Sequence, residues 1–476
     1  MLRFILNDKL VETVLPSGST VLDFVRYHKR LAGTKIGCRE GDCGACTILV
    51  GDIENGRLVY RSMTSCLMPL GIAAGKHIVS VEGINLPDDR HRLNELTPVQ
   101  QALVDTNGTQ CGFCTIGFVM SLTGFMLCET ATKYEDAIAA IDGNICRCTG
   151  YKSIERAAEL LTEKISTKPA SGHLGWLVKN EIVPAYFENI KERLLALRKS
   201  NSTASLQSSE TLIVGGGTDL LVQKQLAVKK SAISHVFDTQ TLKGIILDNG
   251  EYKIGASVTV TEFAESTLMQ GCFQELKKYM KLISSTPIRN MATLAGNLVN
   301  ASPIGDLTVF LLALDASVIL NDGKNKRRIK LKEFYKAYKQ VDKTNEEHIE
   351  SIIFIPPAKD AVFNFEKVSK RTHLDIATVN TACLVQLNAD GSIHDIHLSA
   401  GGVAPFPKYL SQTVAFLKGK KIEAGVLKDA ISIINTEIAP ISDARGTKEY
   451  KRLLLRQLFL AHFSKEESLI KKVIGN

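Results

Sequence analysis

The 476-residue sequence contains no apolar run long enough to cross a lipid bilayer. Its two longest apolar runs, Ile116–Cys128 and Leu307–Leu320, are too short or too often interrupted by polar residues. Residues Met1–Pro16 alternate apolar and polar side chains and lack the charged and apolar regions of a secretory signal. We therefore expect a cytoplasmic protein without a membrane span.

Features of nucleic-acid-binding proteins are also missing. The sequence has no zinc-finger spacing and no interleaving of aromatic with basic residues, although its net charge is +8. The densest basic stretch, Lys324–Lys332, follows a turn signal at Asp322-Gly323, which is typical of a solvated hairpin. We therefore expect no binding to DNA or RNA.

What the sequence does contain is enough apolar residues for several cores, and clustered cysteines. A chain of 476 residues with 45% hydrophobic residues predicts three or more soluble globular domains. Eight of the 11 cysteines fall into two groups before Thr149. Without a secretory signal, such clustering favours metal binding over a disulfide framework.

The first group has C-x4-C-x2-C spacing followed by a distant fourth cysteine, and consists of Cys38, Cys43, Cys46 and Cys66. This spacing is typical of plant-type [2Fe–2S] ferredoxins. Gly37, Gly41 and Gly44 would let the backbone approach the sulfides of a cluster closely. Zinc is the alternative, although zinc sites favour paired short spacings.

The residues around the first group predict the strands and helix of a small ferredoxin-like domain. Leu2–Leu6 and Leu10–Val14 alternate on either side of Asn7-Asp8, as the two strands of a hairpin do. Ser19 or Thr20 can cap a short helix that runs through Leu31.

The second group is a C-x2-C pair and a C-x-C pair, and consists of Cys111, Cys114, Cys146 and Cys148. Helix signals surround both pairs, and predict helices from Thr97-Pro98 to Asn107-Gly108, over Ile116–Leu127, over Tyr134–Ile141, and over Ile154–Ile165 after a Ser153 cap. Four such helices could place a cluster at one end of a bundle. On spacing alone, zinc stays an alternative, whereas a C-x2-C redox disulfide lacks the strand expected before it.

The three remaining cysteines carry no sign of chemistry. Cys128 lies on an apolar helical face and Cys383 in the strand-like run Thr381–Leu387, so we expect both to be buried structural thiols. Nothing around Cys272 suggests a nucleophile.

Two stretches in the second half of the chain have the composition of ligand-binding loops. They follow a predicted linker that begins at Ser166 and is rich in small and polar residues. In Leu212–Leu221 an apolar strand leads into three glycines, whose backbone could approach a phosphate, although the loop fits neither the P-loop nor the Rossmann pattern. Thr293–Leu307 combines small residues, two amides and a carboxylate, which suits a ligand-lining segment. The alternative for the three glycines is a simple turn. The alternative for the second stretch is a cap plus turn before a helix over Leu307–Leu314.

Several of these segments resemble the molybdenum hydroxylase family. Gln110–Gly117 and Gly143–Tyr151 are similar to the motifs around the family's second iron–sulfur cluster, although Ile116 stands where the family usually has proline. The two ligand-loop stretches resemble motifs of its FAD-binding domain. Lys367–Ala377 and Gly401–Pro405 resemble later parts of its flavin-carrying portion. The resemblance thus covers nearly the whole chain.

The resemblance implies an α+β multidomain fold. The expected parts are a β-grasp [2Fe–2S] ferredoxin-like domain (1–84), an all-helical [2Fe–2S] bundle domain (85–165), a linker (166–180), an FAD-binding PCMH-type α+β domain (181–360) and a C-terminal α/β domain like that of CO dehydrogenase flavoproteins (361–476).

The resemblance also implies which residues bind the cofactors. The eight grouped cysteines would hold two [2Fe–2S] clusters. The FAD diphosphate would lie on Val214, Gly215, Gly216, Gly217, Thr218, Asp219 and Leu220. Further FAD contacts would come from Gly296, Asn297, Asn300, Ser302 and Asp306, with Lys367 and Asp375 near the isoalloxazine. Gln110 would contact a molybdopterin carried by a partner protein.

The function implied by the resemblance is electron transfer within an oxidoreductase. Electrons would come from a molybdenum centre on a large molybdopterin-binding subunit and pass through the second cysteine group, then the first, to FAD and on to NAD⁺. The heterodimer would itself dimerise. Having both clusters and the flavin on one chain favours the purine-oxidising branch, which converts hypoxanthine and xanthine to urate. An aldehyde or N-heterocycle hydroxylase, a stand-alone electron-transfer flavoprotein and a zinc-stabilised scaffold are the alternatives.

Overall fold

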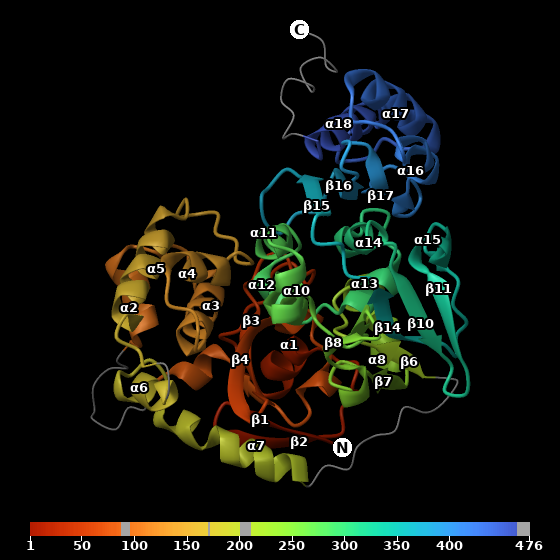
Figure 1. Ribbon diagram of the computed structural model, residues 1–476. Coiled ribbons are helices and arrows are strands. Elements are labelled where there is room, and N and C mark those ends of the chain that lie inside the picture. Colours follow the sequence, from red (N-terminus) through yellow and green to blue (C-terminus); the bar gives the residue numbers. More distant parts are fainter. Residues whose placement is uncertain (87–95, 170–171, 200–210, 464–476) are drawn as a thin grey trace. The chain divides into compact units, whose positions relative to one another are not determined.

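The computed structural model describes residues 1–86, 96–169, 172–199 and 211–463. The chain divides into two compact units. Figure 1 labels the helices and strands from which they are built. The first comprises Met1–Phe237 together with Ser285–Ala292, and the second comprises Asp238–Ser284 and the residues from Thr293 onward. Within the described ranges, no helix has the length and apolar character needed to cross a membrane.

The first unit begins with a five-stranded sheet in the order β2-β1-β5-β3-β4. The bounds of its strands are Leu2–Leu6 for β1, Lys9–Thr13 for β2, Thr47–Glu54 for β3, Arg57–Thr64 for β4 and His77–Val79 for β5. The predicted hairpin is confirmed, and Asn7 in its turn has a φ of 53°. Since β5 pairs parallel with β1 and antiparallel with β3, the sheet has the strand order of a β-grasp, as predicted.

The helix predicted after Ser19 is present but shorter than expected. The Thr20 hydroxyl accepts a hydrogen bond from the Asp23 backbone N–H and so caps α1 (Val21–Asp23), which continues into a π-helical turn, η1 (Phe24–His28). Arg30 has a φ of 57°, which a right-handed helix cannot accommodate, so the helix stops before Leu31.

Four helices follow the sheet, as the sequence predicted: α2 (Pro98–Asp105), α3 (Thr115–Leu127), α4 (Tyr134–Ala140) and α5 (Lys152–Ile165). Thr97 begins α2 with a reciprocal capping box to Gln100. The predicted Ser153 cap of the last helix is wrong. Tyr151 takes the cap position at a φ of 69°, and Ser153 is buried inside the helix.

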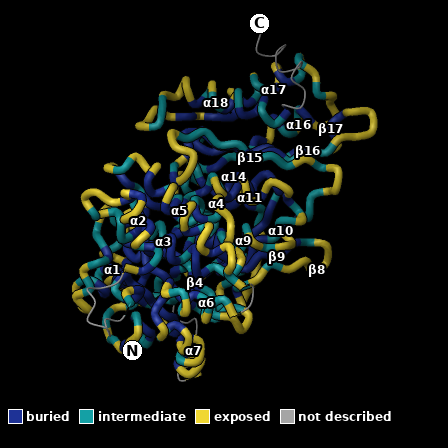
Figure 2. The backbone as a smooth tube through the Cα atoms, turned by 90° about the vertical axis from the view of Figure 1, so that its left-hand side faces the viewer, coloured by how far each residue is buried: buried dark blue, intermediate teal, exposed yellow. Residues whose placement is uncertain are grey.

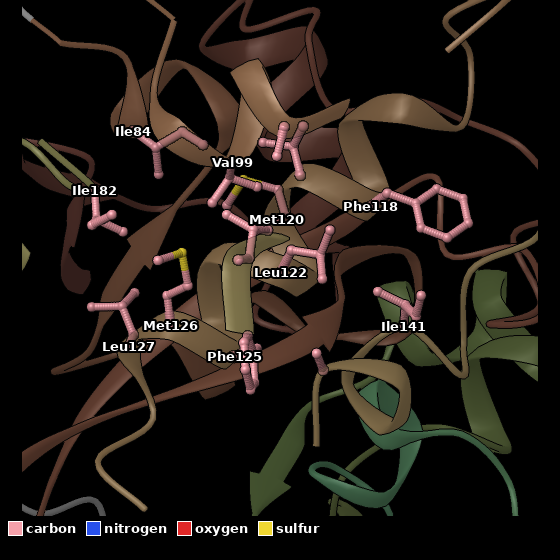
Figure 3. Packing of buried hydrophobic residues seen from close by; sticks show 14 of the residues in the cluster. Ile84, Val99, Phe118, Met120, Leu122, Phe125, Met126, Leu127, Ile141 and Ile182 are labelled. Atoms are coloured by element: carbon pink, nitrogen blue, oxygen red, sulfur yellow. The ribbon is translucent and has the colours of Figure 1, made fainter. Parts of the chain in front are cut away.

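The third helix, α3, is the centre of the largest core of this unit. Ten of its 13 residues are buried, and a helix that is apolar on all sides needs neighbours on all sides. It packs against β3, β4 and the other helices. Figure 3 shows Phe118, Leu122 and Phe125 among the closely packed side chains of this core. The position of α3 is therefore fixed by contacts with both the sheet and the helical region.

Part of the segment predicted as a linker is helical, which corrects that prediction. Residues 170–171 lie outside the described part, but α6 (His173–Lys179) follows directly, and its Leu177 is fully buried in the core around α3. A 3-10 turn, η5 (Ala185–Asn189), then leads into α7 (Ile190–Lys199), which has one buried face and one exposed face (Figure 2). The polar composition of the segment hid the apolar residues that anchor it.

The rest of the first unit consists of a parallel strand pair and two helices. β6 (Leu212–Val214) pairs with β7 (Ile233–His235), and α8 (Leu220–Lys230) connects them. The short helix α12 (Thr286–Arg289) also belongs to this unit, and it contacts β4.

The second unit contains two larger sheets. One has the order β11-β10-β14-β9-β8, and its strands are β8 (Ile245–Asp248), β9 (Glu251–Gly255), β10 (Ser317–Asn321), β11 (Lys326–Lys330) and β14 (His348–Phe354). The predicted turn at Asp322-Gly323 connects β10 to β11, and Arg327 and Arg328 of this hairpin form ion pairs with Glu347 and Glu251. The basic stretch is thus a solvated hairpin, as predicted.

The other sheet is antiparallel and has the order β15-β16-β17-β18. Its strands are β15 (Val362–Val368), β16 (Val379–Leu387), β17 (Ile393–Gly401) and β18 (Lys408–Tyr409). It shares a core with α16 (Ser411–Leu417), α17 (Ala424–Glu437) and α18 (Lys448–Ala461). Cys383 is fully buried in β16, as predicted, whereas Cys128 at the end of α3 is only half-buried.

The helices that follow β9 and precede β10 in the sequence carry the second predicted ligand stretch. They include α9 (Val260–Glu265), α10 (Thr267–Cys272), α11 (Leu276–Lys281), α13 (Leu294–Asn300) and α14 (Asp306–Leu312). α14 packs against β16 and β17. The predicted helix over Leu307–Leu314 is therefore present and begins one residue earlier.

Candidate functional site

The four cysteines of the first group come together at one end of the β3–β4 pair. Three of them lie in the loop before β3, and Cys66 lies in the 3-10 turn η2 (Ser65–Leu67) after β4. Thr47 and Thr64 are opposite each other in the antiparallel register, so the loop and the turn are adjacent. The side chains interact as two pairs, Cys38 with Cys43 and Cys46 with Cys66, and Cys38 is also close enough to interact electrostatically with the second pair.

Hydrogen bonds within this group favour one thiolate in each pair of cysteines. The Cys43 thiol lowers the pKa of Cys38 to about 5, and the Cys66 thiol lowers the pKa of Cys46. The same pairing, together with burial, raises the pKa of Cys43 and of Cys66. The backbone N–H of Glu40 donates to Cys38 Sγ at 3.3 Å. Amide donors aimed at sulfur are the outer-shell contacts that stabilise metal-bound thiolates.

The three glycines of this loop differ in what they contact. A Cβ on Gly37 would lie 2.6 Å from Cys43 Sγ, so the absence of a side chain here leaves room for this thiol. Gly41 instead packs against the side chains of Leu67 and Ile288. Gly44 has a φ of +68°, and its Cβ would lie 2.4 Å from the carbonyl oxygen of Gly143. The close neighbour of Gly44 is therefore the second cysteine loop.

The second group assembles at two turns of the helical region. Cys111 and Cys114 lie between α2 and α3, and Cys146 and Cys148 lie between α4 and α5. The sulfur atoms of Cys111 and Cys148 are 3.7 Å apart, and the Cys114 and Cys146 thiols form the other pair. Two thiolates bound to one tetrahedral metal ion at about 2.3 Å each lie about 3.8 Å apart. The Cys111–Cys148 pair has the spacing needed to share one metal ion.

The pKa values of Cys114 and Cys146 in the second group shift in opposite directions. Burial and the neighbouring Cys146 thiol raise the pKa of Cys114 to about 12. Burial opposes ionisation of Cys146, but the Thr149 hydroxyl, which donates to its sulfur at 3.1 Å, and nearby backbone amides lower the pKa of Cys146 overall. Thr149 and the Tyr151 hydroxyl, which accepts from the Cys146 N–H at 3.1 Å, were not singled out from the sequence. The feature of the sequence that could have indicated both residues is their position within the Gly143–Tyr151 motif.

The thiols of each cysteine group lie as two pairs, an arrangement that a two-iron cluster would fit. In the described part of the chain, no three Cys, His, Asp or Glu side chains surround a single ion position. Each cysteine group instead forms two pairs, as two bridged iron ions require. A structural zinc ion needs all four ligands around one point.

The predicted Gln110 directly precedes Cys111 of the second cysteine group and is exposed, as is Phe113.

The predicted diphosphate loop lies between β6 and α8. Val214 is buried at the end of β6, Gly215–Thr218 form the turn, and Asp219 and Leu220 begin the helix. A Cβ on Gly216 would lie 1.8 Å from the carbonyl oxygen of Met291. Gly216 is thus required for packing against this backbone segment, irrespective of any bound cofactor.

The second predicted stretch forms α13, the following turn and the start of α14. The Thr293 hydroxyl caps α13 by accepting from the Gly296 N–H at 3.1 Å. Gly296 is exposed, and Asn297, Asn300 and Ser302 are half-buried. The Pro303 carbonyl in the turn accepts a hydrogen bond from the Gly402 N–H at 2.8 Å, so the Gly401–Pro405 segment contacts this stretch.

Asp306 and Lys367 form a buried polar cluster at the start of α14. The Lys367 side chain is 1% exposed, and its ammonium group donates to Asp306 Oδ2 at 2.8 Å and to the Leu282 carbonyl at 2.6 Å. The other oxygen of Asp306 accepts from the Asn380 amide. Asp375, the other predicted isoalloxazine neighbour, instead accepts from the Arg371 N–H at 2.9 Å. Of the predicted flavin residues in the second unit, the structure brings Asp306 and Lys367 into direct contact. Asn380 was missed.

Four protein-family models match the chain in succession. They describe a 2Fe-2S iron-sulfur cluster binding domain (4–70), a [2Fe-2S] binding domain (80–159), the FAD binding domain in molybdopterin dehydrogenase (189–358) and the CO dehydrogenase flavoprotein C-terminal domain (365–465). This succession defines an α+β iron–sulfur flavoprotein, as the predicted fold class stated. The chain is similar to the iron–sulfur and flavin portion of the molybdenum hydroxylase family.

Curated relatives support the same assignment over most of the chain. Xanthine dehydrogenase of Emericella nidulans is 29% identical over 88% of this chain and 35% of its own length. Xanthine dehydrogenase 1 of Arabidopsis thaliana is 28% identical over 95% of this chain and 39% of its own length. Human aldehyde oxidase is 25% identical over 99% of this chain and 40% of its own length. The chain spans less than half of the length of these relatives.

Solved structures share the fold of about half of the chain. A CO dehydrogenase chain from Oligotropha carboxidovorans matches with a TM-score of 0.51 and 21% identity, over 54% of this chain and 90% of that chain. A chain of quinoline 2-oxidoreductase from Pseudomonas putida 86 matches with a TM-score of 0.50 and 19% identity, over 56% of this chain and 92% of that chain.

Proposed function

We propose that this chain is the electron-transfer subunit of a xanthine dehydrogenase. It would accept electrons from a molybdenum centre on a large partner subunit, where hypoxanthine and xanthine are oxidised to urate, and deliver them to NAD⁺. The observation that carries this proposal is the pair of four-thiol groups on the same chain as a flavin-type domain. The relatives named xanthine dehydrogenase, which align over most of the chain, support the choice of substrate.

The eight grouped cysteines would hold the two clusters. When bound, the clusters would exchange single electrons, and FAD, which exchanges one or two, would release a hydride to NAD⁺. The protein's contribution is to hold the thiolates and tune them. The Glu40 N–H on Cys38 and the Thr149 hydroxyl on Cys146 both stabilise negative charge on sulfur.

The FAD contacts are proposed from the two stretches described above. The turn Gly215–Thr218, flanked by Val214, Asp219 and Leu220, would face the diphosphate, because glycine backbone exposes its N–H groups. Gly296, Asn297, Asn300 and Ser302 would supply further contacts, together with Asp306, Lys367 and Asp375 near the ring system.

A large molybdopterin-binding partner is proposed because two of the matching family models describe domains of molybdopterin dehydrogenase and of CO dehydrogenase flavoprotein. Gln110 is exposed directly before Cys111, so its amide is accessible to a group carried by such a partner. Its proposed role is to contact the pterin next to the second cluster.

A second candidate is a hydroxylase of aldehydes or N-heterocycles. The match to human aldehyde oxidase over 99% of this chain favours it specifically. The substrate pocket would lie on the partner in both cases, so the residues of this chain serve either reaction.

The test is to purify the protein from its native host with whatever co-elutes, and to measure iron, molybdenum and flavin. NAD⁺ reduction is then assayed with xanthine, hypoxanthine and aldehydes. The proposal expects all three cofactors and reduction with the purines. Activity with aldehydes alone would select the second candidate, and a preparation with flavin but no molybdenum would indicate a stand-alone flavoprotein.

A further inference from the structure

The two cysteine loops touch through their backbones. The N–H of Ile145 donates to the carbonyl oxygen of Cys43 at 3.1 Å. Cys43 belongs to the first cysteine group, and Ile145 directly precedes Cys146 of the second. A single hydrogen bond therefore connects a candidate ligand of one centre to the residue next to a candidate ligand of the other.

Asn144 connects the same two loops to α3. This residue is 5% exposed, its side-chain amide donates to the Gly44 carbonyl at 3.2 Å, and its Oδ1 accepts from the Ser121 hydroxyl at 2.7 Å. The Gly44 carbonyl also accepts from the N–H of Thr47 at 3.0 Å and from its hydroxyl at 2.7 Å. The contact from Asn144 is thus not needed to satisfy this carbonyl, and what it adds is a link between the loops.

Steric contacts leave no room between the loops and α3. A Cβ on Gly117 of α3 would lie 2.2 Å from the Gly44 carbonyl oxygen. Close C···O contacts in proteins are about 3.3–3.6 Å, so an alanine at this position would have to push the loop away by about 1 Å. The neighbour that would have to move is backbone, which cannot turn aside as the end of a side chain can.

We propose that Asn144, held by Ser121, is a positioning residue that fixes the two cysteine loops in backbone contact and thereby sets electron exchange between the two centres. This inference rests on the proposed function, because it requires both clusters. The exchange moves one electron from one centre to the other and breaks no bond. Its rate depends steeply on the separation of the centres and on the covalent and hydrogen-bonded path between them. The contacts of Asn144 with Gly44 and Ser121 control both.

The experiment uses the complete protein with all its cofactors and compares four variants. Asn144→Asp places a carboxylate oxygen where the amide donated to Gly44, and Ser121→Ala removes only the hydroxyl that orients Asn144. Gly117→Ala forces the loops apart. Gly124→Ala is the matched control, because it lies two turns further along the same helix and its Cβ would meet side chains and no backbone, namely the end of Leu49 at 2.8 Å and Ser62 Cβ at 3.9 Å.

Three measurements distinguish positioning from a general structural effect. They are iron content, the magnetic interaction between the two reduced centres in electron paramagnetic resonance, and hydrogen exchange at the Ile145 N–H. For Asn144→Asp and Ser121→Ala we expect full iron, a weaker magnetic interaction, and exchange at Ile145 faster by about fivefold, as the loss of one ordinary hydrogen bond implies. For Gly124→Ala we expect wild-type values.

The outcomes separate this inference from the proposed function. Wild-type protein without iron would overturn the proposed function itself. Iron-loaded Asn144→Asp and Ser121→Ala proteins with wild-type magnetic interaction and wild-type exchange at Ile145 would overturn only the role of Asn144. If Asn144→Asp or Gly117→Ala fails to retain iron, the milder Ser121→Ala variant decides by the same two readouts.

Discussion

Replacing Lys367 by methionine tests whether the buried cluster at the start of α14 is a structural ion pair or a cofactor contact. Methionine has a similar length and no charge, so the change removes the ammonium group with little loss of volume. Asp306 would keep its hydrogen bond from Asn380 but would lose its counter-ion. Its side chain is only 14% exposed, so water could replace the lysine only in part.

Breaking a buried ion pair by removing one partner costs about 3–5 kcal/mol. We therefore expect Lys367→Met to lower the free energy of unfolding of the second unit by about this amount. The single change Asp306→Leu should cost a similar amount, because it strands the 1%-exposed lysine. The double variant should cost clearly less than the sum of the two, since it leaves no unpaired charge.

Urea unfolding followed by circular dichroism gives the stability, and released flavin gives the FAD content. Lys451→Met is the matched control. Lys451 has a side chain 2% exposed, donates to Asp443 at 2.7 Å and to the Ile441 carbonyl at 2.9 Å, and lies away from the predicted flavin residues in sequence. The control should lose stability but keep FAD, whereas Lys367→Met should lose both. A change below about 1 kcal/mol at Lys367, or additive single changes, would refute the pairing argument.

Three further predictions follow from the first unit. Gly216→Ala should destabilise it by about 1–3 kcal/mol even without FAD, because the new methyl group would overlap the Met291 carbonyl; an unchanged urea midpoint of the apoprotein would contradict this. Cys43→Ser should halve the iron content and abolish NAD⁺ reduction while dye reduction by the partner survives, and unchanged NAD⁺ reduction would show that electrons bypass this centre. Burial lowers the pKa of His77 to about 3, below the value of about 6.5 in an unfolded chain. The unfolded state therefore binds the proton first, so stability is complete above about pH 6.5 and falls by up to about 1.4 kcal/mol per pH unit toward pH 3. His77→Gln should flatten this slope in urea titrations at pH 7.5 and 5.5.

Local signals in the sequence predicted the elements that depend on neighbouring residues. The Thr97 capping box with Gln100, the hairpin around Asn7-Asp8 and the cysteine spacings all involve residues a few positions apart, whose geometry is fixed by short-range sterics and hydrogen bonds. The composition of residues 166–180 predicted a linker. Part of this segment is helical instead, because Leu177 packs into a core whose other residues are distant in the sequence.

Contacts between distant parts of the chain could not be predicted from one sequence. The N–H of Thr286 donates to Asp142 at 2.7 Å, and Arg289 pairs with the same carboxylate at 2.6 Å, across more than 140 residues. The contact of Gly117 with Gly44 is of the same kind. In each case the residue type alone also fits a local role, a helix cap for Thr286 and a tight turn for Gly44, so no local pattern reveals the distant partner.

The most direct test is metal analysis of the purified protein from its native host, combined with electron paramagnetic resonance after reduction. The account predicts about four iron atoms per chain, two for each four-cysteine site, and two distinct reduced-cluster signals. Zinc in place of iron, or a protein with no metal at all, would contradict it.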